Sequence, residues 1–120
     1  MITYKTAETK EDRIHFCKIA ISNRLFINGW QLRSHLASIV NGYTDPVEIE
    51  VSLAFDDDKP IAIAFKSNRV VQCFVRSSYR EKGIGTNLVS LHKCPKTYAR
   101  LGNDASAIFW AKNKIICSNY

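Results

Sequence analysis

The sequence predicts a mixed α/β (α+β) domain, in which helices cover both faces of one mixed β-sheet. Three observations favour this fold class. Apolar residues alternate with polar ones from Val47 to Phe55, the period of a strand, and two short apolar runs follow. Before this strand, two stretches repeat apolar residues at helical spacing. After it, a strand is followed by two glycines and a helix, and a helical crossover joins parallel strands.

Three elements are predicted before the alternating strand. Residues 2–6 favour a short strand, and Thr9 with Asp12 three positions later resembles a capping box at the start of a helix. That helix is predicted to end near Phe26, and a second helix ends at Gly42, which suits a C-terminal cap. The apolar residues that define the two helices are Ile14, Cys17, Ile21 and Leu25, then Leu32, Leu36, Ile39 and Val40.

The remaining elements begin with the alternating strand. Two further strands, over 61–65 and 70–75, follow it across short polar turns, which favours an antiparallel meander. A helix from Ile84 that Pro95 stops, a strand over 97–101, a helix over 105–114 and a short final strand complete the chain. The predicted order is therefore β-α-α-β-β-β-α-β-α with a shortened C-terminal strand.

Length and composition limit the class of protein. The chain has 120 residues, of which 46% are hydrophobic, so we expect residues 1–120 to form one domain. No run approaches the roughly 20 apolar residues of a membrane span, and residues 1–13 are too polar for a secretory signal, so we expect a cytoplasmic protein with no membrane partner. The four cysteines are far apart, which indicates reduced thiols and no metal site.

Charge is distributed unevenly along the chain. Residues 1–60 hold 7 Lys/Arg and 9 Asp/Glu, a net charge of −2, whereas residues 61–120 hold 10 and 2, a net charge of +8. The positive half contains the glycine pair. Such a half favours an anionic ligand, either a phosphorylated cofactor or a nucleic acid.

The glycine pair marks a candidate binding loop. Gly83 and Gly85 stand one residue apart beside Arg80 and Lys82, and two glycines at this spacing indicate a backbone that a ligand approaches closely. The loop from Arg80 to Thr86 can turn several N–H groups toward one point at a helix N-terminus, which suits a pyrophosphate.

Two common phosphate motifs do not fit this loop. A Walker loop requires Gly-x-x-x-x-Gly-Lys-Ser/Thr, which is absent. A dinucleotide fingerprint requires a third glycine where Leu88 stands.

A third motif does fit, and a second motif accompanies it. Val75-x-x-x-Tyr79-Arg80-x-Lys82-Gly83-Ile84-Gly85-x-x-Leu88 resembles the acetyl-coenzyme A signature of the GNAT N-acetyltransferase superfamily, Gln/Arg-x-x-Gly-x-Gly/Ala. Asn103-x-x-Ser106-x-x-Phe109-Trp110-x-Lys112-x-Lys114-Ile115 resembles the later Asn-x-x-Ala-x-x-Leu/Phe-Tyr-x-Lys-x-Gly-Phe of the same family. The resemblance is sharp from Val70 to Ile115 and architectural before that.

The resemblance implies a cosubstrate and a binding mode. Acetyl-CoA would donate an acetyl group to an amine that attacks directly in a ternary complex. The pantetheine arm would lie between the strands over 70–75 and 97–101, and the glycine loop would hold the pyrophosphate. The residues that the resemblance assigns to cofactor binding are Phe74, Val75, Arg80, Lys82, Gly83, Ile84, Gly85, Thr86, Asn103 and Phe109.

The chain departs from the family at the general acid. Where the family commonly has a tyrosine that protonates the leaving thiolate, this chain has Trp110, and an indole N–H is not a general acid near neutrality. A thiol with a pKa of about 8.5 also leaves as the thiolate, with water or Tyr98 as a substitute donor. A half-buried strand aromatic explains Tyr98 better than a catalytic role does.

No general base stands out. Residues 69–75 contain no acid, and the facing of Glu48 and Glu50 on the alternating strand favours solvated side chains. His15 and His35 fall within helices, where a surface or partly buried histidine is the default. A site with no base favours an amine of low pKa, because a lysine costs roughly 4 kcal/mol to deprotonate at neutral pH and an α-amine less than about 1 kcal/mol.

The acceptor and the retention of catalysis stay open at this point. The acceptor could be a protein terminus, a lysine, a small amine or a charged tRNA. The chain ends at Tyr120, so we expect the acceptor side to be open or completed by a second subunit of a homodimer. One alternative is a catalytically lapsed module that binds a partner protein, and another is a nucleic-acid binder that uses the positive half.

Overall fold

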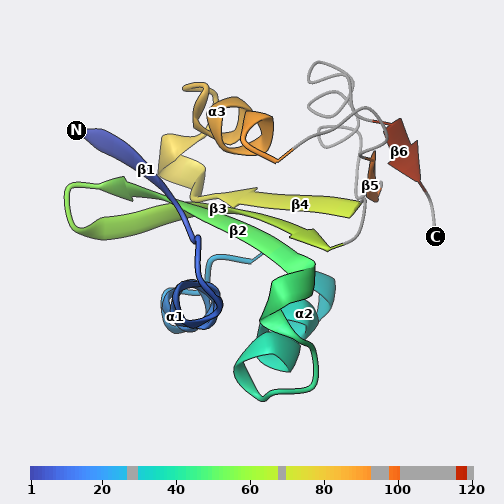
Figure 1. The fold of residues 1–120 in the computed structure, drawn as a ribbon. Helices are drawn as coiled ribbons and strands as arrows, with labels where there is room; N and C mark the ends of the chain where they lie inside the picture. The colour runs from blue at the N-terminus through green and yellow to red at the C-terminus, as the bar shows by residue number, and fades with distance from the viewer. Residues whose placement is uncertain (27–29, 68–69, 93–97, 101–115, 119–120) are drawn as a thin grey trace.

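The computed structural model describes residues 1–26, 30–67, 70–92, 98–100 and 116–118, which form three α-helices and a six-stranded sheet (Figure 1). The strands are β1 (Ile2–Thr6), β2 (Ile49–Asp56), β3 (Lys59–Ser67), β4 (Val70–Val75), β5 (Tyr98–Arg100) and β6 (Ile116–Ser118). The helices are α1 (Lys10–Ser22), α2 (Trp30–Val40) and α3 (Ile84–Ser90), with short 3-10 turns η1 (Pro46–Glu48) and η2 (Ser77–Tyr79).

The sheet is mixed, and its strands lie in the order of the sequence. β1 to β4 are antiparallel neighbours, which confirms the predicted meander of β2, β3 and β4. β5 is parallel to β4, as the helical crossover through α3 predicts, and β6 is parallel to β5. The predicted helix over 105–114 lies outside the described residues.

Helix α1 begins as predicted but ends earlier. Thr9 is its N-cap, and the Thr9 side chain accepts a hydrogen bond of 3.0 Å from the backbone N–H of Asp12. The prediction of an end near Phe26 was wrong, because the helix ends at Ser22 and Arg24 adopts a left-handed conformation with φ 55°. Leu25 is nevertheless fully buried, because the chain turns back onto the core. Leu25 therefore continues the apolar pattern of α1 although it lies beyond the end of the helix.

Strand β2 begins two residues later than the alternation indicated. The Asp45 side chain accepts a hydrogen bond of 3.0 Å from the backbone N–H of Val47, which caps the turn η1. Pro46 suits the first position of such a turn because it has no N–H to satisfy. Val47 is 56% exposed, so it belongs to the turn and not to the core face of β2.

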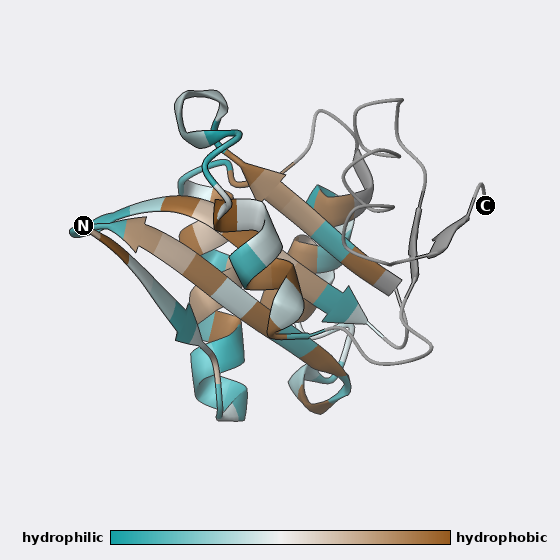
Figure 2. Ribbon diagram, turned by 90° about the horizontal axis from the view of Figure 1, so that it is seen from above, coloured by the Kyte–Doolittle hydropathy of each residue, from teal (hydrophilic) through white to brown (hydrophobic). Residues whose placement is uncertain are grey.

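Helices cover both faces of the sheet, as predicted. In Figure 1, α1 and α2 lie below the sheet and α3 lies above it. The lower core contains Leu32, Leu36 and Ile39 of α2 with Val51, Leu53, Ile63 and Phe65 of the strands. The upper core contains Ile84 and Leu88 of α3 against Ala54, Ile61, Ala62 and Ala64. Figure 2, seen from the side of α3, shows apolar residues along the middle of the strands.

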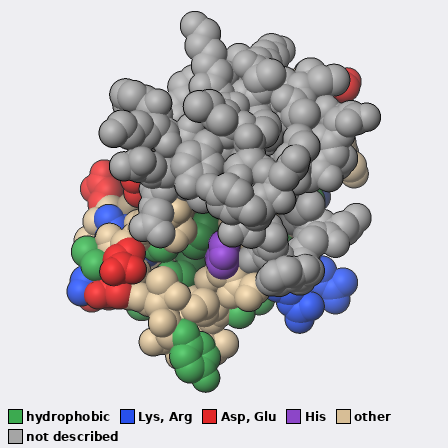
Figure 3. Space-filling view, turned by 90° about the vertical axis from the view of Figure 1, so that its right-hand side faces the viewer, with side chains coloured by type: hydrophobic (Ala, Val, Ile, Leu, Met, Phe, Trp, Pro, Cys, Tyr) green, Lys and Arg blue, Asp and Glu red, His purple; other side chains and the backbone are tan. Residues whose placement is uncertain are grey.

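Surface charge is segregated on the face that Figure 3 shows. Among the described residues, most of the visible acidic side chains lie on one side of this face, and the largest group of basic side chains lies on the opposite side.

Candidate active site

The candidate site begins where β4 ends. The chain passes from Val75 through η2 into a loop that starts α3 at Ile84. Glu81 and Gly83 both have left-handed conformations in this loop, with φ of 63° and 79°. A Cβ atom at Gly83 would meet no heavy atom within 4 Å, so the backbone there borders open space. The loop therefore presents bare backbone at an exposed turn.

Basic side chains lie against the end of β4. Arg80 Nε donates a hydrogen bond of 2.9 Å to the backbone oxygen of Val75, and Arg80 Cζ lies 5.7 Å from the centroid of the Phe74 ring. Lys82 Nζ lies 5.8 Å from the centroid of the Tyr79 ring. Both cations therefore lie beside the loop that the sequence predicted to hold a phosphate group.

The end of β4 also has an edge without a partner strand among the described residues. Within the described residues, β5 pairs with β4 at Val70 and Val71, and no later residue of β4 has a partner on this side. Arg76 donates its backbone N–H to Ile61 of β3 over 2.9 Å. Because successive strand residues point their backbone groups to opposite sides, those of Val75 point away from β3 and toward this edge.

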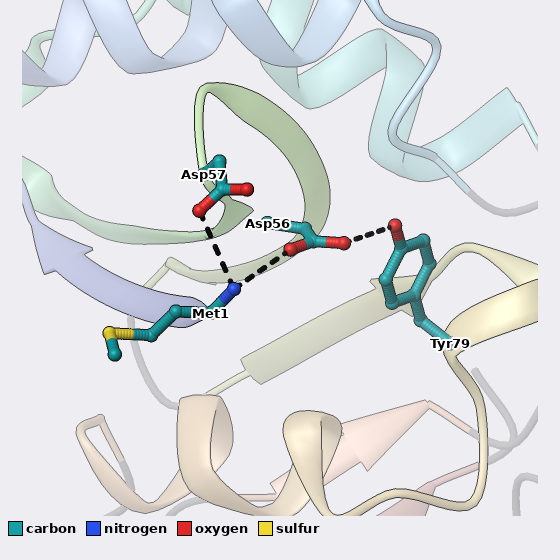
Figure 4. A network of polar contacts seen from close by, with 4 residues as sticks. All are labelled: Met1, Asp56, Asp57 and Tyr79. Carbon is teal, nitrogen blue, oxygen red and sulfur yellow. Dashed lines mark hydrogen bonds and ion pairs between the residues drawn. The ribbon is translucent and has the colours of Figure 1, made fainter.

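Tyr79 ties the loop to the hairpin between β2 and β3 (Figure 4). Its hydroxyl donates a hydrogen bond of 2.7 Å to Asp56, whose other oxygen lies 3.3 Å from the amino group of Met1. The hydrogen bond from Tyr79 and that from the Met1 amine hold the pKa of Asp56 below its ordinary value. The same Asp56 contact raises the pKa of Tyr79, and the Asp56 and Asp57 carboxylates raise the pKa of the Met1 amine.

A cavity of about 500 Å³ lies on the α1 and α2 side of the end of β4. Its lining residues are Ile21, Arg24, Phe26, Arg33 and Phe74. Phe74 joins the cavity to the loop, because Arg80 lies over the same ring. The end of β4 thus separates two regions, a basic loop with bare backbone and a cavity with two guanidinium groups.

Arg76 holds one wall of this cavity. It donates from Nη2 to the backbone oxygen of Asn23 over 2.9 Å and from Nε to that of Pro60 over 3.2 Å. Asn23 is the C-cap of α1 and directly precedes Arg24. The end of α1 is therefore fixed to the end of β4 by a charge-assisted hydrogen bond.

His92 is a polar residue that the sequence did not single out. It is 3% exposed; its Nε2 lies 2.6 Å from Ser52 Oγ, and its Nδ1 lies 3.0 Å from Glu50 Oε1. Because a carboxylate only accepts, Nδ1 donates to Glu50. This order of Ser, His and Glu resembles that of a hydrolase triad, but Ser52 is fully buried and also bonds Thr6 at 2.8 Å. The network therefore ties β1 and β2 to the end of α3.

The surroundings of Glu50 differ from the solvated side chain that was predicted. Its carboxylate is 48% exposed, but it lies 3.4 Å from Lys66 Nζ as well as beside His92. Partial burial raises the pKa of Glu50, while the hydrogen bond from His92 and the charge of Lys66 lower it by more, so the pKa lies below its ordinary value. The period-2 alternation of a strand shows which face of the sheet a side chain lies on. It does not show that His92, which follows α3, is the partner of Glu50.

The two other histidines lie on helices, as predicted. His15 is exposed on α1. His35 lies between α2 and the sheet, where its Nδ1 is 2.8 Å from Gln72 Nε2 and its ring stacks 5.9 Å from that of Phe65. Gln72 is two residues before Phe74 on β4, so His35 lies on the cavity side of the sheet.

The structure gathers most of the predicted cofactor residues at one place. Phe74 and Val75 end β4, while Arg80, Lys82, Gly83, Ile84, Gly85 and Thr86 form the loop and the first turn of α3. The side chain of Ile84 is buried and Gly85 has none, so these two residues could contact a ligand only through backbone groups. Asn103, Phe109 and Trp110 lie outside the described residues. Tyr98 pairs with Val70, five positions before Val75 and about 16 Å away along a strand, so it does not lie beside the loop.

The described residues show neither a membrane-spanning helix nor a metal-binding cluster. No α-helix among them has the length and hydropathy that crossing a bilayer requires. The described ranges also contain no cluster of three or more His, Cys, Asp or Glu side chains that could hold a metal ion. The Cys17 thiol is buried in the lower core, and burial raises its pKa to about 12.

Similarity to known proteins is found in structure and not in sequence. No family model and no curated protein matches the sequence. Among solved structures, aminoglycoside N-acetyltransferase AAC(6')-Iy in complex with CoA aligns with a TM-score of 0.65 and 18% identity over 96% of this chain and 88% of the other. Glucosamine-6-phosphate N-acetyltransferase from Arabidopsis thaliana aligns with a TM-score of 0.58 and 13% identity over 100% and 93%. A GNAT family acetyltransferase from Streptococcus pneumoniae aligns with a TM-score of 0.61 and 15% identity over 96% and 87%.

Proposed function

We propose, from the premise that this chain has the fold of the GNAT N-acetyltransferases, that it transfers an acetyl group from acetyl-CoA to an amine. The observation that carries the proposal is the arrangement at the end of β4. An exposed loop with bare backbone and two cations lies on one side of this end, and a cavity large enough for a small acceptor lies on the other.

The residues at the loop fit a coenzyme A molecule. The open space at Gly83 leaves room for a diphosphate to approach the backbone, and Arg80 and Lys82 supply positive charge beside it. The backbone groups of Val75 face the edge of β4 that has no partner strand there among the described residues, and they suit the amide groups of a pantetheine arm. Arg80 Nε must then leave the Val75 oxygen, which its exposed position allows.

The reaction needs a neutral amine as the nucleophile and a leaving thiolate that departs as the anion or takes up a proton. Acetyl-CoA supplies the acetyl group as a thioester; the amine nitrogen forms a bond to the carbonyl carbon, the C–S bond breaks, and the amine loses a proton. The five described lining residues of the cavity include no carboxylate and no histidine. We therefore expect water to accept the proton that the amine loses. We also expect an acceptor amine of low pKa, such as an α-amine at about 7.7–8.0.

The direct test combines binding with turnover. Calorimetric titration with acetyl-CoA should show saturable binding, and free thiol should be released when an amine is present. Trp110→Tyr, which restores the phenol common in the family, should preserve or raise the rate of acetyl transfer. An active native protein that Trp110→Tyr inactivates would show that the indole shapes the acceptor pocket and that our interpretation of it as a lost acid is wrong.

A second candidate function follows from Trp110 itself. If the missing phenol marks a lapsed enzyme, the chain binds a partner protein, with or without coenzyme A. Thiol release would then stay at the blank rate in both the native protein and Trp110→Tyr, with no acetylated product. That result, with acetyl-CoA binding intact, would favour the binding module over the transferase.

A further inference from the structure

The cavity beside β4 has a composition that indicates the kind of molecule it accepts. Of the five residues that line it within the described part of the chain, two are arginines, two are phenylalanines and one is isoleucine. No acidic residue is among them. A site for a polycationic amine would instead need carboxylates, because opposite charges attract and like charges repel.

Arg24 and Arg33 border the cavity without a carboxylate partner among the described residues. Across the described part of the chain, neither guanidinium group forms an ion pair, and both residues are exposed. Arg33 Cζ lies 5.9 Å from the centroid of the Phe26 ring, which orients the guanidinium group without satisfying its N–H donors. Two cations with free donors therefore border the same cavity.

Arg76 shows what a structural arginine looks like in this region. Its guanidinium donates to two backbone oxygens, and it holds the end of α1 in place. Arg24 follows the residue that Arg76 binds and has a left-handed backbone, which turns the chain out of α1. The fold thus fixes the backbone of Arg24 while its side chain remains free to bind a ligand.

The cavity also lies at the correct place for an acceptor. Phe74 lines it and directly precedes Val75, whose backbone the proposed function assigns to the pantetheine arm. A molecule that enters from the α1 and α2 side would bring its amine toward β4 and leave its remaining part near the arginines.

We propose that the acceptor is an amine that also carries an anionic group, a carboxylate or a phosphate, which Arg24 and Arg33 bind. Guanidinium groups suit both anions, because their paired N–H donors match two oxygens of one group. The aromatic rings of Phe26 and Phe74 would contact the carbon skeleton between the anion and the amine. This inference rests on the proposed function, since it assigns the cavity to the acceptor.

Matched pairs of small amines test the charge preference. 2-Aminoethyl phosphate differs from ethanolamine by the phosphate alone, and β-alanine differs from β-alaninamide by the carboxylate alone. We expect the dissociation constant of the anionic member to be at least about tenfold lower in one or both pairs. The preference should shrink as salt is added, because the arginines are exposed. The pair with the larger preference identifies the anion.

Variants assign the preference to the two arginines. The double variant Arg24→Gln, Arg33→Gln should bind both members of each pair equally, while its thermal unfolding and its acetyl-CoA affinity match those of the native protein. Lys18→Gln removes one positive charge from the exposed side of α1, outside the cavity lining, and should keep the preference.

The outcomes separate this inference from the proposed function. Equal affinities within both pairs, or a preference that survives in the double variant, would overturn the inference even if uncharged amines are acetylated. A preference that the double variant removes, without acetyl transfer to any amine, would support the anion site and refute the transferase.

Discussion

His92 is the residue that connects a buried polar network between α3 and the sheet. It lies directly beyond the last turn of α3 and reaches β2, where it contacts Ser52 and Glu50. Ser52 is fully buried, so its hydroxyl needs partners inside the protein. We interpret the network as a tie between α3 and the sheet, and the loop that precedes α3 depends on the same placement.

Substitution of His92 should therefore lower stability without changing cosubstrate binding directly. His92→Ala removes a buried ring and one partner of Ser52, and we expect a loss of about 1–3 kcal/mol in the free energy of unfolding, measured by urea denaturation. His15→Ala, at an exposed position of α1, should change it by less than about 0.5 kcal/mol. Equal effects of the two substitutions would contradict the structural role of His92.

Glu50 gives the protein an acid-sensitive contact. Its pKa is lower in the folded protein than in the unfolded chain, so the unfolded chain binds the proton more readily. The contribution of Glu50 to stability is then present above its unfolded pKa of about 4.3 and is lost as the pH falls through the lower folded value.

The pH dependence of unfolding should show this contribution. Between about pH 5 and pH 3, the native protein should lose stability more steeply than Glu50→Gln, and above about pH 6 the difference between them should be constant. Glu48→Gln is the matched control, because Glu48 is exposed in η1 and forms no ion pair within the described ranges. Parallel profiles of the native protein and Glu50→Gln would refute the role of this carboxylate.

At the scale of elements, the turn from β4 into α3 is the part that the proposed function requires. Gly83 has φ 79° and is the N-cap of α3, and Gly42, in the turn after α2, has φ 80°. A Cβ atom at either glycine would meet nothing within 4 Å. The two positions therefore impose the same backbone strain on a substitution, but only Gly83 lies in the candidate site.

This pair of glycines gives a controlled test of the loop. Gly83→Asp places a negative charge where the diphosphate would lie, and Asp tolerates a left-handed backbone better than most residues. We expect it to weaken acetyl-CoA binding at least about tenfold, which corresponds to about 1.4 kcal/mol. Gly42→Asp should lose similar stability and keep the native affinity in calorimetric titrations. Equal affinities of the two variants would place the coenzyme elsewhere.

Bulky substitutions at Gly83 and Gly85 would test the loop less cleanly than Gly83→Asp does. Gly85 is buried in α3, so Gly85→Val would disturb the packing of the helix as well as any ligand. Gly83→Val would be strained by the left-handed backbone, which β-branched residues rarely adopt. Loss of binding in either variant would therefore mix unfolding with a direct effect on the loop.

At the scale of the whole molecule, local patterns predicted the elements and their neighbours. The period-2 run in β2, the cap at Thr9 and the helical crossover through α3 each depend on residues close in sequence, and the structure confirms all three. The end of α1 was missed because Leu25 stays buried after the chain has turned at Arg24. The spacing of apolar residues shows which positions are buried. Buried positions can continue after the last hydrogen bond of a helix, so the spacing does not fix where the helix ends.

The candidate site was predictable only in part, for a similar reason. The glycine loop is a continuous segment, so its residue types alone could predict a phosphate-binding loop. The cavity instead combines Ile21 and Arg24 from the end of α1 with Arg33 of α2 and Phe74 of β4. No spacing rule joins residues that are 50 positions apart in the chain. The partners of His92 were hidden for the same reason, because Ser52 lies 40 positions earlier.

The central claim is that this chain moves an acetyl group from acetyl-CoA to an amine nitrogen. The most direct measurement incubates the native protein with isotopically labelled acetyl-CoA and a panel of anionic, neutral and cationic amines, and follows free thiol and N-acetylated product together by absorbance and mass spectrometry. We predict that thiol and labelled amide form in equal amounts, require both the protein and an amine, and fall sharply in Gly83→Asp but not in Gly42→Asp. Thiol release at the blank rate with every amine, and no labelled amide, would contradict the account.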